Sequence, residues 1–527
     1  MRLKMHSVPR RGLSRRNIAL AVLVLLLQTS LVLSRTYYIA PNGEDSNTGT
    51  ISSPFASVMR AQMAASSGDT VYLRGGSYFL DDSNLTATKN PWAIVNDLTK
   101  SGIRYVAYPG ERPVFDFSNV RPAGFRVTAF LISGSDCVFK GFDVVGVQVT
   151  IQTNHTQSEC FRIAGGNRNR FEQLAMHDGM GIGWYLTSGA SNFVLNCDAY
   201  NNRGLDSGSL GNIDGFGAHP NSSSGRGNVF SGCRAWFNSD DGFDLINAKA
   251  AVTITNCWAL YNGYFTNFSS STGDGNGFKA GGYGRNGSTP PIPVPRHTVQ
   301  FCLAVRNRAN GFYANHHTGG LNWFDNTAYR NGVNFNLLCT LSDNLTDVPG
   351  YDQLMKNNVG YQGKTEVANL GTSNDVTFNY FTLPVTVATD DFMTLDENLL
   401  ALPRQANGEL PLVTFARLAN GSDLIDAGTN VGFSFSGSAP DLGAFEKGSV
   451  NVQPTLKLAL SGSNLVFTGH GGWQGGTFQL LSATRLTLPK DQWRTVATNT
   501  FDSAGSYILS NTFPAGEVQQ FYRVSLP

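Results

Sequence analysis

The chain is poor in charged residues, which make up 15% of its 527 positions, and its formal net charge is only +1. A helical bundle would need more Lys, Glu, Ala and Leu, whereas 58 glycines and 11% aromatic residues favour an all-β chain. The near-neutral charge gives no support for nucleic acid as a partner. Any acidic ligand would have to be held by a local site.

Cysteine pairs with the spacing of zinc or redox motifs are also missing, because no CxxC occurs. Seven cysteines are an odd number for a disulfide framework, and several share one place in the repeat described below. We therefore expect mostly free, buried thiols that serve as apolar core residues. The seven are Cys137, Cys160, Cys197, Cys233, Cys257, Cys302 and Cys339.

Long apolar runs are absent except near the N-terminus, from about residue 18 to residue 33, behind four arginines. This pattern predicts a secretory signal peptide over residues 1–34, with cleavage near Ser34 or Arg35. An uncleaved membrane anchor is the alternative, but the run is shorter than the ~20 residues that a spanning helix needs. We expect a secreted, extracellular protein that has no membrane contact after cleavage.

A repeat runs through the middle of the chain. Aligned alanines lie 24, 36, 24, 45 and 24 residues apart, and a polar residue follows each by three positions. Such a period indicates stacked coils of short strands, with equivalent residues ~4.8 Å apart on neighbouring coils. The polar residues should form a ladder that turns the chain. The alanines are Ala175, Ala199, Ala235, Ala259, Ala304 and Ala328, and the polar residues are Asp178, Asn202, Asn238, Asn262, Asn307 and Asn331.

The predicted fold is all-β, a right-handed parallel β-helix over residues 35–448 followed by a small β-sandwich over residues 455–527. Leucine-rich repeats are the competing solenoid, but their LxxLxL spacing is absent. An amphipathic helix from about Pro54 to Ala65 should cap the N-terminal end, where bare strand edges would otherwise aggregate. Clean alternation after residue 455 suggests about seven strands without a catalytic constellation.

Four units of the repeat carry a Gly-Phe pair, and stacking the Phe residues aligns the polar residues around them. This register places Asp214 one coil below Asp241, with Asp240 beside it, and Asp244 directly below Lys279. Four carboxylates so close together would repel one another unless a cation neutralised them. Because all the donors are carboxylate oxygens, we expect Ca²⁺ rather than zinc or copper.

Lys279 is the other singular residue of this cluster. The Ala-Gly-Gly that follows it leaves room for a polymer backbone. A neutral lysine could take the proton next to a uronate carboxylate, while the cation stabilises the charge that develops in β-elimination. Since a free lysine has a pKa near 10.4, we expect an alkaline optimum.

At these residues the chain resembles the pectate lyases of polysaccharide lyase family 9, over about residues 36–446. The motifs are IDGF at 213–216, NSDDGFD at 238–244 and GNGFK at 275–279. The resemblance implies that Asp214, Asp240, Asp241 and Asp244 bind the catalytic Ca²⁺ and that Lys279 is the Brønsted base. It also implies a lyase that cuts an acidic pectic polymer of the polygalacturonate type and leaves 4,5-unsaturated products.

Two other functions stay open. A β-helix glycoside hydrolase would use Asp240 and Asp241 as acid and base, and would need no calcium. A non-catalytic carbohydrate-binding adhesin would use calcium only to brace its loops. Ultraviolet-absorbing products separate the lyase from the hydrolase, and loss of turnover on changing Lys279 separates it from the adhesin.

Arginines near the cluster could pair with sugar carboxylates, and tyrosines could stack on sugar rings. The candidates for substrate binding are Arg285, Arg308, Tyr283 and Tyr313. Histidines are expected in solvated loops, at His177, His219, His316 and His317. The expected partner is a uronic-acid polymer, and we expect a monomer.

Overall fold

The computed structural model describes residues 34–151, 157–204, 211–271, 273–284 and 287–447, and in the C-terminal part 455–462, 464–470, 477–485, 488, 492–502, 506–512 and 520–525. The expected signal peptide lies almost entirely outside these residues. No helix within the described ranges is long and apolar enough to cross a membrane.

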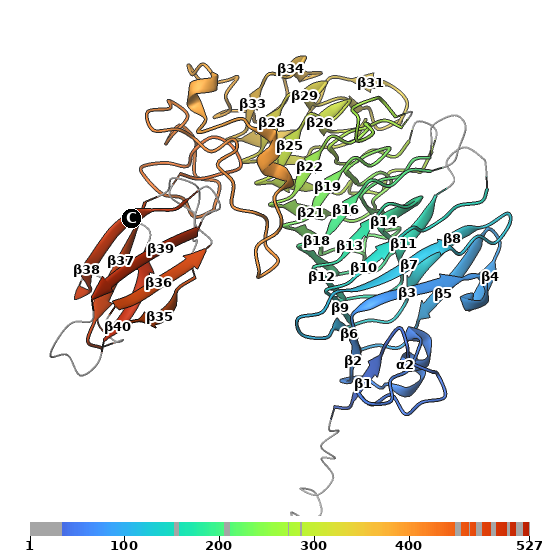
Figure 1. Cartoon of the computed structure of the whole chain (residues 1–527). Coiled ribbons are helices and arrows are strands. Elements are labelled where there is room, and N and C mark those ends of the chain that lie inside the picture. Colours follow the sequence, from blue (N-terminus) through green and yellow to red (C-terminus); the bar gives the residue numbers. More distant parts are fainter. Residues whose placement is uncertain are drawn as a thin grey trace, which may run out of the picture.

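Residues 36–368 form a solenoid in which three sheets receive one strand from each successive coil (Figure 1). All strand pairs of the three sheets are parallel except that of β4 with β5. We call the sheets 1, 2 and 3 in the order in which a coil visits them. The predicted parallel β-helix is therefore confirmed.

Sheet 1 contains, in order, β1 (Thr36–Ile39), β2 (Thr70–Leu73), β6 (Arg104–Ala107), β9 (Val138–Lys140), β12 (Arg170–Glu172), β15 (Phe193–Leu195), β18 (Asn228–Ser231), β21 (Val252–Thr255), β24 (Thr298–Gln300), β27 (Asn322–Phe324) and β32 (Leu354–Lys356). Sheet 2 contains β3 (Gly76–Asp81), β7 (Pro113–Asn119), β10 (Asp143–Val145), β13 (Ala175–His177), β16 (Asp198–Tyr200), β19 (Arg234–Trp236), β22 (Trp258–Leu260), β25 (Leu303–Val305), β28 (Thr327–Tyr329) and β33 (Val359–Tyr361). Sheet 3 contains β34 (Thr365–Ala368), β29 (Val333–Asn336), β26 (Asn310–Tyr313), β23 (Phe278–Lys279), β20 (Phe243–Asp244), β17 (Phe216–Ala218), β14 (Gly181–Ser188), β11 (Ser158–Ala164), β8 (Arg126–Ile132), β5 (Trp92–Leu98) and β4 (Ala87–Lys89).

The interior consists of columns of like residues, one per coil. Ala199, Ala235, Ala259, Ala304 and Ala328 pair in register along sheet 2, as predicted. The prediction is wrong for Ala175, because β13 pairs Met176 with Ala199 and Ala175 with Asp198. All seven cysteines lie in described residues, and each is a free, buried thiol, in agreement with the sequence.

Buried asparagines turn each coil from sheet 2 towards sheet 3. Their side-chain amides form a continuous ladder in which each donates to the carbonyl oxygen of the next at 3.0–3.2 Å. The ladder comprises Asn202, Asn238, Asn262, Asn307 and Asn331. Asp178 is not part of it, since its carboxylate accepts from Asn201, so this residue was predicted in the wrong register.

Helix α2 (Val58–Ala64) covers the N-terminal end of the solenoid (Figure 1). It begins after Ser57, whose side chain accepts from the Arg60 amide. Its buried Gln62 donates to the Asp97 carbonyl, which ties the helix to β5. The predicted cap is thus present, starting four residues later than Pro54.

A segment after β34 returns along the outer face of sheet 2. It includes the 3-10 turns η2 (Thr389–Asp391) and η3 (Glu397–Ala401), and its apolar residues bury Trp258, Leu260 and Val305 of sheet 2. Two further short elements are β30 (Cys339–Thr340) with β31 (Asp347–Val348), and η1 (Asp82–Asn84). The returning segment also reaches the coils of β12 and β16, where Gln173 donates to the Asn407 carbonyl and Arg404 donates to Asp198.

The C-terminal strands form two antiparallel sheets. One contains β35 (Lys457–Ser461), β36 (Asn464–His470) and β39 (Ser506–Thr512), and the other β38 (Arg494–Thr500), β37 (Thr477–Ala483) and β40 (Phe521–Ser525). Phe467 of the first sheet and Phe478 of the second belong to one buried cluster. The described residues thus contain six strands packed as two sheets, where the sequence suggested about seven.

Candidate active site

The predicted polar cluster lies on the outer face of sheet 3. Phe243 pairs with Phe278 and Asp244 with Lys279, so the register expected from the Gly-Phe pairs is confirmed. Inside the coil the phenylalanine rings stack with centroids 5.0 Å apart. This stack fixes the height of each coil, and with it the spacing of the polar side chains on the outer face.

A second polar ladder carries two of the carboxylates. The Asp241 amide donates to Asp214 Oδ1 at 3.1 Å, and both the backbone and side-chain N–H groups of Asn276 donate to Asp241 Oδ1 at 2.7 Å. Asn310 continues the ladder by donating to Asn276. Asp214 and Asp241 therefore occupy positions that later coils fill with neutral amides.

Three carboxylates meet at one point. Oxygens of Asp214, Asp240 and Asp241 all lie within 4.8 Å of one another, and all three residues are buried. Burial and mutual repulsion hold the pKa of Asp214 and of Asp240 well above the usual range and raise that of Asp241 to about 6. The three carboxylates are therefore unstable when all are ionised and no cation is bound. Their oxygen atoms are the ligands that a hard divalent cation such as Ca²⁺ prefers.

Asp244 stands next to this trio. Its Oδ1 accepts from the Ile246 amide at 2.7 Å, which orients the carboxylate, and its Oδ2 lies 3.4 Å from Lys279 Nζ. Asp244 is 5% exposed, but it is not among the carboxylates whose oxygens lie within 4.8 Å of one another, so three of the four predicted calcium ligands meet at one point and the fourth lies beside Lys279.

Lys279 is buried among these carboxylates, with 8% of its surface exposed. Its Nζ lies 3.1 Å from Asp241 Oδ2 and 3.9 Å from Asp274 Oδ2. Burial alone would lower the pKa of this amine, but the charges of Asp241, Asp244 and their neighbours outweigh it and hold the pKa well above its usual value. Without a cation, the lysine is an ammonium that balances the carboxylates.

A pocket of about 210 Å³ opens over Lys279 and Asp244. Its opposite wall is formed by Tyr185 of β14 and by His219, whose Nδ1 lies 3.2 Å from the Tyr185 hydroxyl. Gly217 leaves space for the tyrosine ring, since a Cβ there would lie 2.9 Å from Tyr185 Cδ2. The pocket thus places a polar wall opposite the amine.

His219 was expected in a solvated loop, and the structure corrects this. Its buried Nε2 forms no hydrogen bond and lies 4.0 Å from Asp244 Oδ2. Burial lowers the pKa of the imidazole, so the ring is neutral at neutral pH. If Tyr185 donates to Nδ1, Nε2 carries the proton and can donate it to a ligand in the pocket.

Comparison with known proteins identifies the fold family. Residues 37–358 match the family model described as "Pel9A-like, right handed beta helix region". The chain belongs to this family. Among curated Pel9A-like relatives, pectate lyase L of Dickeya chrysanthemi is 36% identical over 430 residues, which cover 80% of this chain and 92% of that protein.

Two solved structures of the same kind extend the comparison. A protein titled "Rhamnogalacturonan lyase" is 46% identical, with a TM-score of 0.70, and the match covers 73% of this chain and 97% of that one. The crystal structure of pectate lyase Pel9A is 33% identical, with a TM-score of 0.63 and coverage of 79% and 98%. The cluster of this chain therefore lies on the fold that carries lyases.

The residues predicted to bind substrate in this Pel9A-like chain lie in different environments. Tyr313 pairs in register with Lys279 and is partly exposed beside it. Arg308 donates to the Gly273 and Asp274 carbonyls, so it braces the loop that brings Asp274 towards Lys279. A sugar contact by this arginine stays a prediction.

For Tyr283 the structure contradicts the predicted stacking on a sugar. It is 1% exposed, its ring stacks on His317 and its hydroxyl donates to the Ala248 carbonyl, so it has no face to offer a sugar. Arg285 lies outside the described residues. Tyr185 was missed because its coil carries no Gly-Phe pair, and only the register of β14 with β17 brings it to the pocket. His219 lies three residues after Phe216, but the Gly-Phe alignment does not show that its side chain turns to the same pocket.

Proposed function

We propose that this protein is a pectic polysaccharide lyase that cuts a galacturonate-containing polymer by β-elimination, with Lys279 as the base. The observation that supports it is the position of the Lys279 amine, 3.1 Å from Asp241 and 3.4 Å from Asp244, at the floor of a pocket on a Pel9A-like fold. Relatives named pectate lyase and rhamnogalacturonan lyase support the same reaction class.

The reaction needs a base on one face of the sugar. The Lys279 amine takes the proton from the carbon next to the uronate carboxylate, and the electron pair of that C–H bond forms the new C4–C5 double bond. The C4–O bond breaks, and the leaving oxygen gains a proton. The products are a shortened chain and a 4,5-unsaturated uronate.

Asp214, Asp240, Asp241 and Asp244 would hold the cation in this proposal. Bound Ca²⁺ would withdraw charge from the substrate carboxylate and so acidify the neighbouring C–H bond. The same aspartates raise the pKa of Lys279 when their charge is not neutralised. The basicity of the amine is therefore linked to the charge state of the four carboxylates.

His219 faces the same space from the opposite wall. In this proposal the Tyr185 hydroxyl donates to Nδ1, so that Nε2, which has no hydrogen-bond partner within the described residues, carries the proton and donates it to the sugar. Tyr185 is in this view a positioning residue, and His219 contacts the substrate.

Two polymers supply the uronate that this chemistry requires. Polygalacturonate is favoured by the pectate lyases among the relatives, and rhamnogalacturonan is the second candidate because of the 46% identity to a rhamnogalacturonan lyase. Ultraviolet absorbance growth on each polymer, with and without chelator, decides between them. A hydrolase would release sugar ends without absorbance, and an adhesin would release none.

Location and assembly complete the proposal. Residues 1–34 would direct secretion and be removed, and the chain would act as an extracellular monomer. N-terminal sequencing of the protein from the culture medium, together with its size in solution, tests both statements. A mature protein that still begins before residue 30, or a stable dimer, would contradict them.

A further inference from the structure

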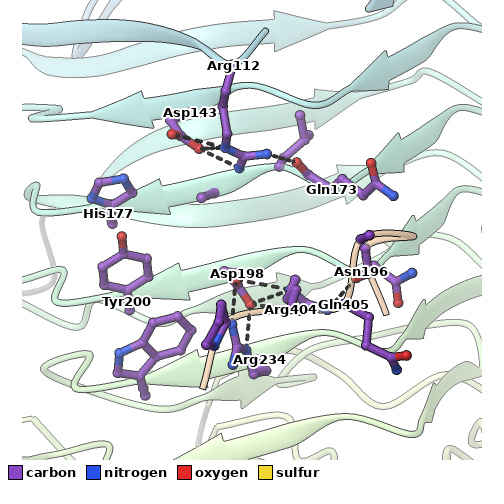
Figure 2. Close-up of a pocket in the computed structure, with 16 residues that line it drawn as sticks. Arg112, Asp143, Gln173, His177, Asn196, Asp198, Tyr200, Arg234, Arg404 and Gln405 are labelled. Atoms are coloured by element: carbon purple, nitrogen blue, oxygen red, sulfur yellow. Dashed lines mark hydrogen bonds and ion pairs between the residues drawn. The ribbon is translucent and has the colours of Figure 1, made fainter. Parts of the chain in front are cut away.

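A larger hollow lies on a different face of the solenoid, on the outer side of sheet 2 (Figure 2). Its volume is about 520 Å³, more than twice that of the pocket over Lys279. Ala175 lines the hollow and stands in register between Asp143 and Asp198. Its side chain is shorter than those of the two aspartates, which leaves space between them. Residues 403–408 form one wall. We call this space the sheet 2 hollow.

The wall of the sheet 2 hollow is held in place. Arg404 donates to Asp198 at 2.7 Å and Arg234 donates to it at 3.0 Å, as Figure 2 shows. Gln173 donates to the Asn407 carbonyl at 2.6 Å. Burial would raise the pKa of Asp198, but the two guanidinium groups outweigh it and lower that pKa. The hollow is therefore preformed around a neutralised ion cluster.

Three flat rings line one side, one from each of three successive coils. His177 stacks on Tyr200 at 4.4 Å and Tyr200 on Trp236 at 4.2 Å, with ring planes within 8° of parallel. The next residues of the same register are Leu260 and Val305. These two are buried under the segment after β34, and Trp236 also packs against that apolar cluster, so the three rings lie at the edge of the covered part of sheet 2.

The lining carries more positive than negative charge. Three arginines face two aspartates, and the exposed member is Arg112, whose side chain is 47% exposed. Its guanidinium donates to Asp143 at 2.6 Å and to the Gln173 carbonyl at 3.0 Å, which holds it at the rim in a fixed orientation. A fixed guanidinium at the rim suits a carboxylate.

We propose that the sheet 2 hollow is a second binding site for the acidic polysaccharide, apart from the site of cleavage. The identity of the polymer rests on the proposed function. Arg112 pairs with a uronate carboxylate, and the side-chain carbonyl oxygens and remaining N–H groups of Gln173, Asn196 and Gln405 bond to sugar hydroxyls. The outward face of His177 and the edges of the rings stacked on it pack against the apolar C–H groups of the sugar. A chain that holds the polymer at two places stays on it between cuts.

The test is the number of short oligosaccharides bound per chain, measured by calorimetry on the Lys279→Ala protein so that nothing is cut. The probe is an oligogalacturonate, or a rhamnogalacturonan oligosaccharide if the unaltered chain cuts that polymer. We expect two bound per chain. Adding Arg112→Ala and His177→Ala should remove one of them and weaken binding to the long polymer by about tenfold, the scale of one charge-assisted hydrogen bond.

Arg168→Ala is the matched control, because Arg168 is exposed and donates to Asp136 just as Arg112 does to Asp143. This change should leave both numbers unaltered, and thermal melting checks that each variant folds. The proposal is overturned if the Arg112 and His177 changes leave stoichiometry and polymer affinity unaltered. Absence of cleavage by the unaltered chain would instead contradict the proposed function, whatever the binding shows.

Discussion

Asp244 and Lys279 pair across neighbouring strands β20 and β23, and their charged atoms lie 3.4 Å apart on the outer face of sheet 3. This contact joins the two halves of the proposed chemistry, since one partner belongs to the carboxylate cluster and the other is the amine. Neither can change its charge without affecting the other.

The first prediction concerns pH. In the cation-free protein burial raises the pKa of Asp241 to about 6, and the neighbouring carboxylates hold the pKa of Lys279 above its usual value. Low pH therefore opposes cation binding by protonating the carboxylates and keeps the amine charged. Cleavage should therefore rise with pH through the range 6–9 at saturating calcium. Initial ultraviolet rates over a buffer series measure this. An optimum below about pH 6 would rule out Lys279 as the base.

The second prediction concerns stability. The raised pKa of Asp214, Asp240 and Asp241 means that the folded state binds extra protons, so the cation-free protein loses stability as pH rises above about 4. The part due to Asp241 is lost as pH passes about 6. Lys279 stays protonated in both states over this range and adds no slope.

Calcium should restore that loss, and the rise in melting temperature on adding it should be larger at pH 8 than at pH 5. Asp240→Asn should reduce this rise, whereas Asp136→Asn, at an exposed carboxylate paired with Arg168, should not. Equal shifts at both pH values would contradict a cation held by these ionised aspartates.

The third prediction concerns His219. His219→Ala should lower kcat/KM by about 10- to 100-fold, because it removes a donor to the bound sugar. His219→Gln keeps an N–H near the position of Nε2 and should recover part of the loss. Tyr185→Phe should give a smaller loss, because it removes the hydroxyl that selects the His219 tautomer but leaves the imidazole in the pocket. Unchanged kinetics in His219→Ala with intact calcium binding would exclude this contact.

The fourth prediction concerns the solenoid. Asn262 accepts from Asn238 and donates to Asn307 and to the Ala235 carbonyl, all in the dry interior. Asn262→Ala should destabilise folding by about 2–4 kcal/mol, because its partners lose their hydrogen bonds without access to water. Urea unfolding measures this. Asn267→Ala, at an exposed loop amide, is the control. A similar loss of unfolding free energy there would show that the buried ladder stabilises the fold no more than an exposed amide does.

Sequence periodicity predicts much of the site because the outer residues are tied to an inner repeat. Phe216, Phe243 and Phe278 stack one per coil, and counting from them places Asp244 below Lys279, as found. The same counting fails one coil earlier. The step from Met176 to Ala199 is 23 residues rather than 24, so aligning on Ala175 shifts the register by one.

Other features could not be read from the sequence because they depend on contacts between distant segments. The hydrogen bonds from Arg308 to the carbonyls of Gly273 and Asp274 are one example, because no repeat places that loop beside the arginine. The sheet 2 hollow likewise needs Arg404, which lies 206 residues from its partner Asp198. The second pairing depends on the path of the returning segment, which the repeat does not predict.

The central claim is tested most directly by Lys279→Ala, assayed for ultraviolet-absorbing products on polygalacturonate and rhamnogalacturonan at saturating calcium. Loss of the base should lower turnover by about 10²–10⁴-fold while calcium binding to the four aspartates persists. Lys140→Ala, at a partly exposed lysine paired with Glu172, should cleave normally. Turnover of Lys279→Ala within about twofold of the unaltered protein would contradict the account.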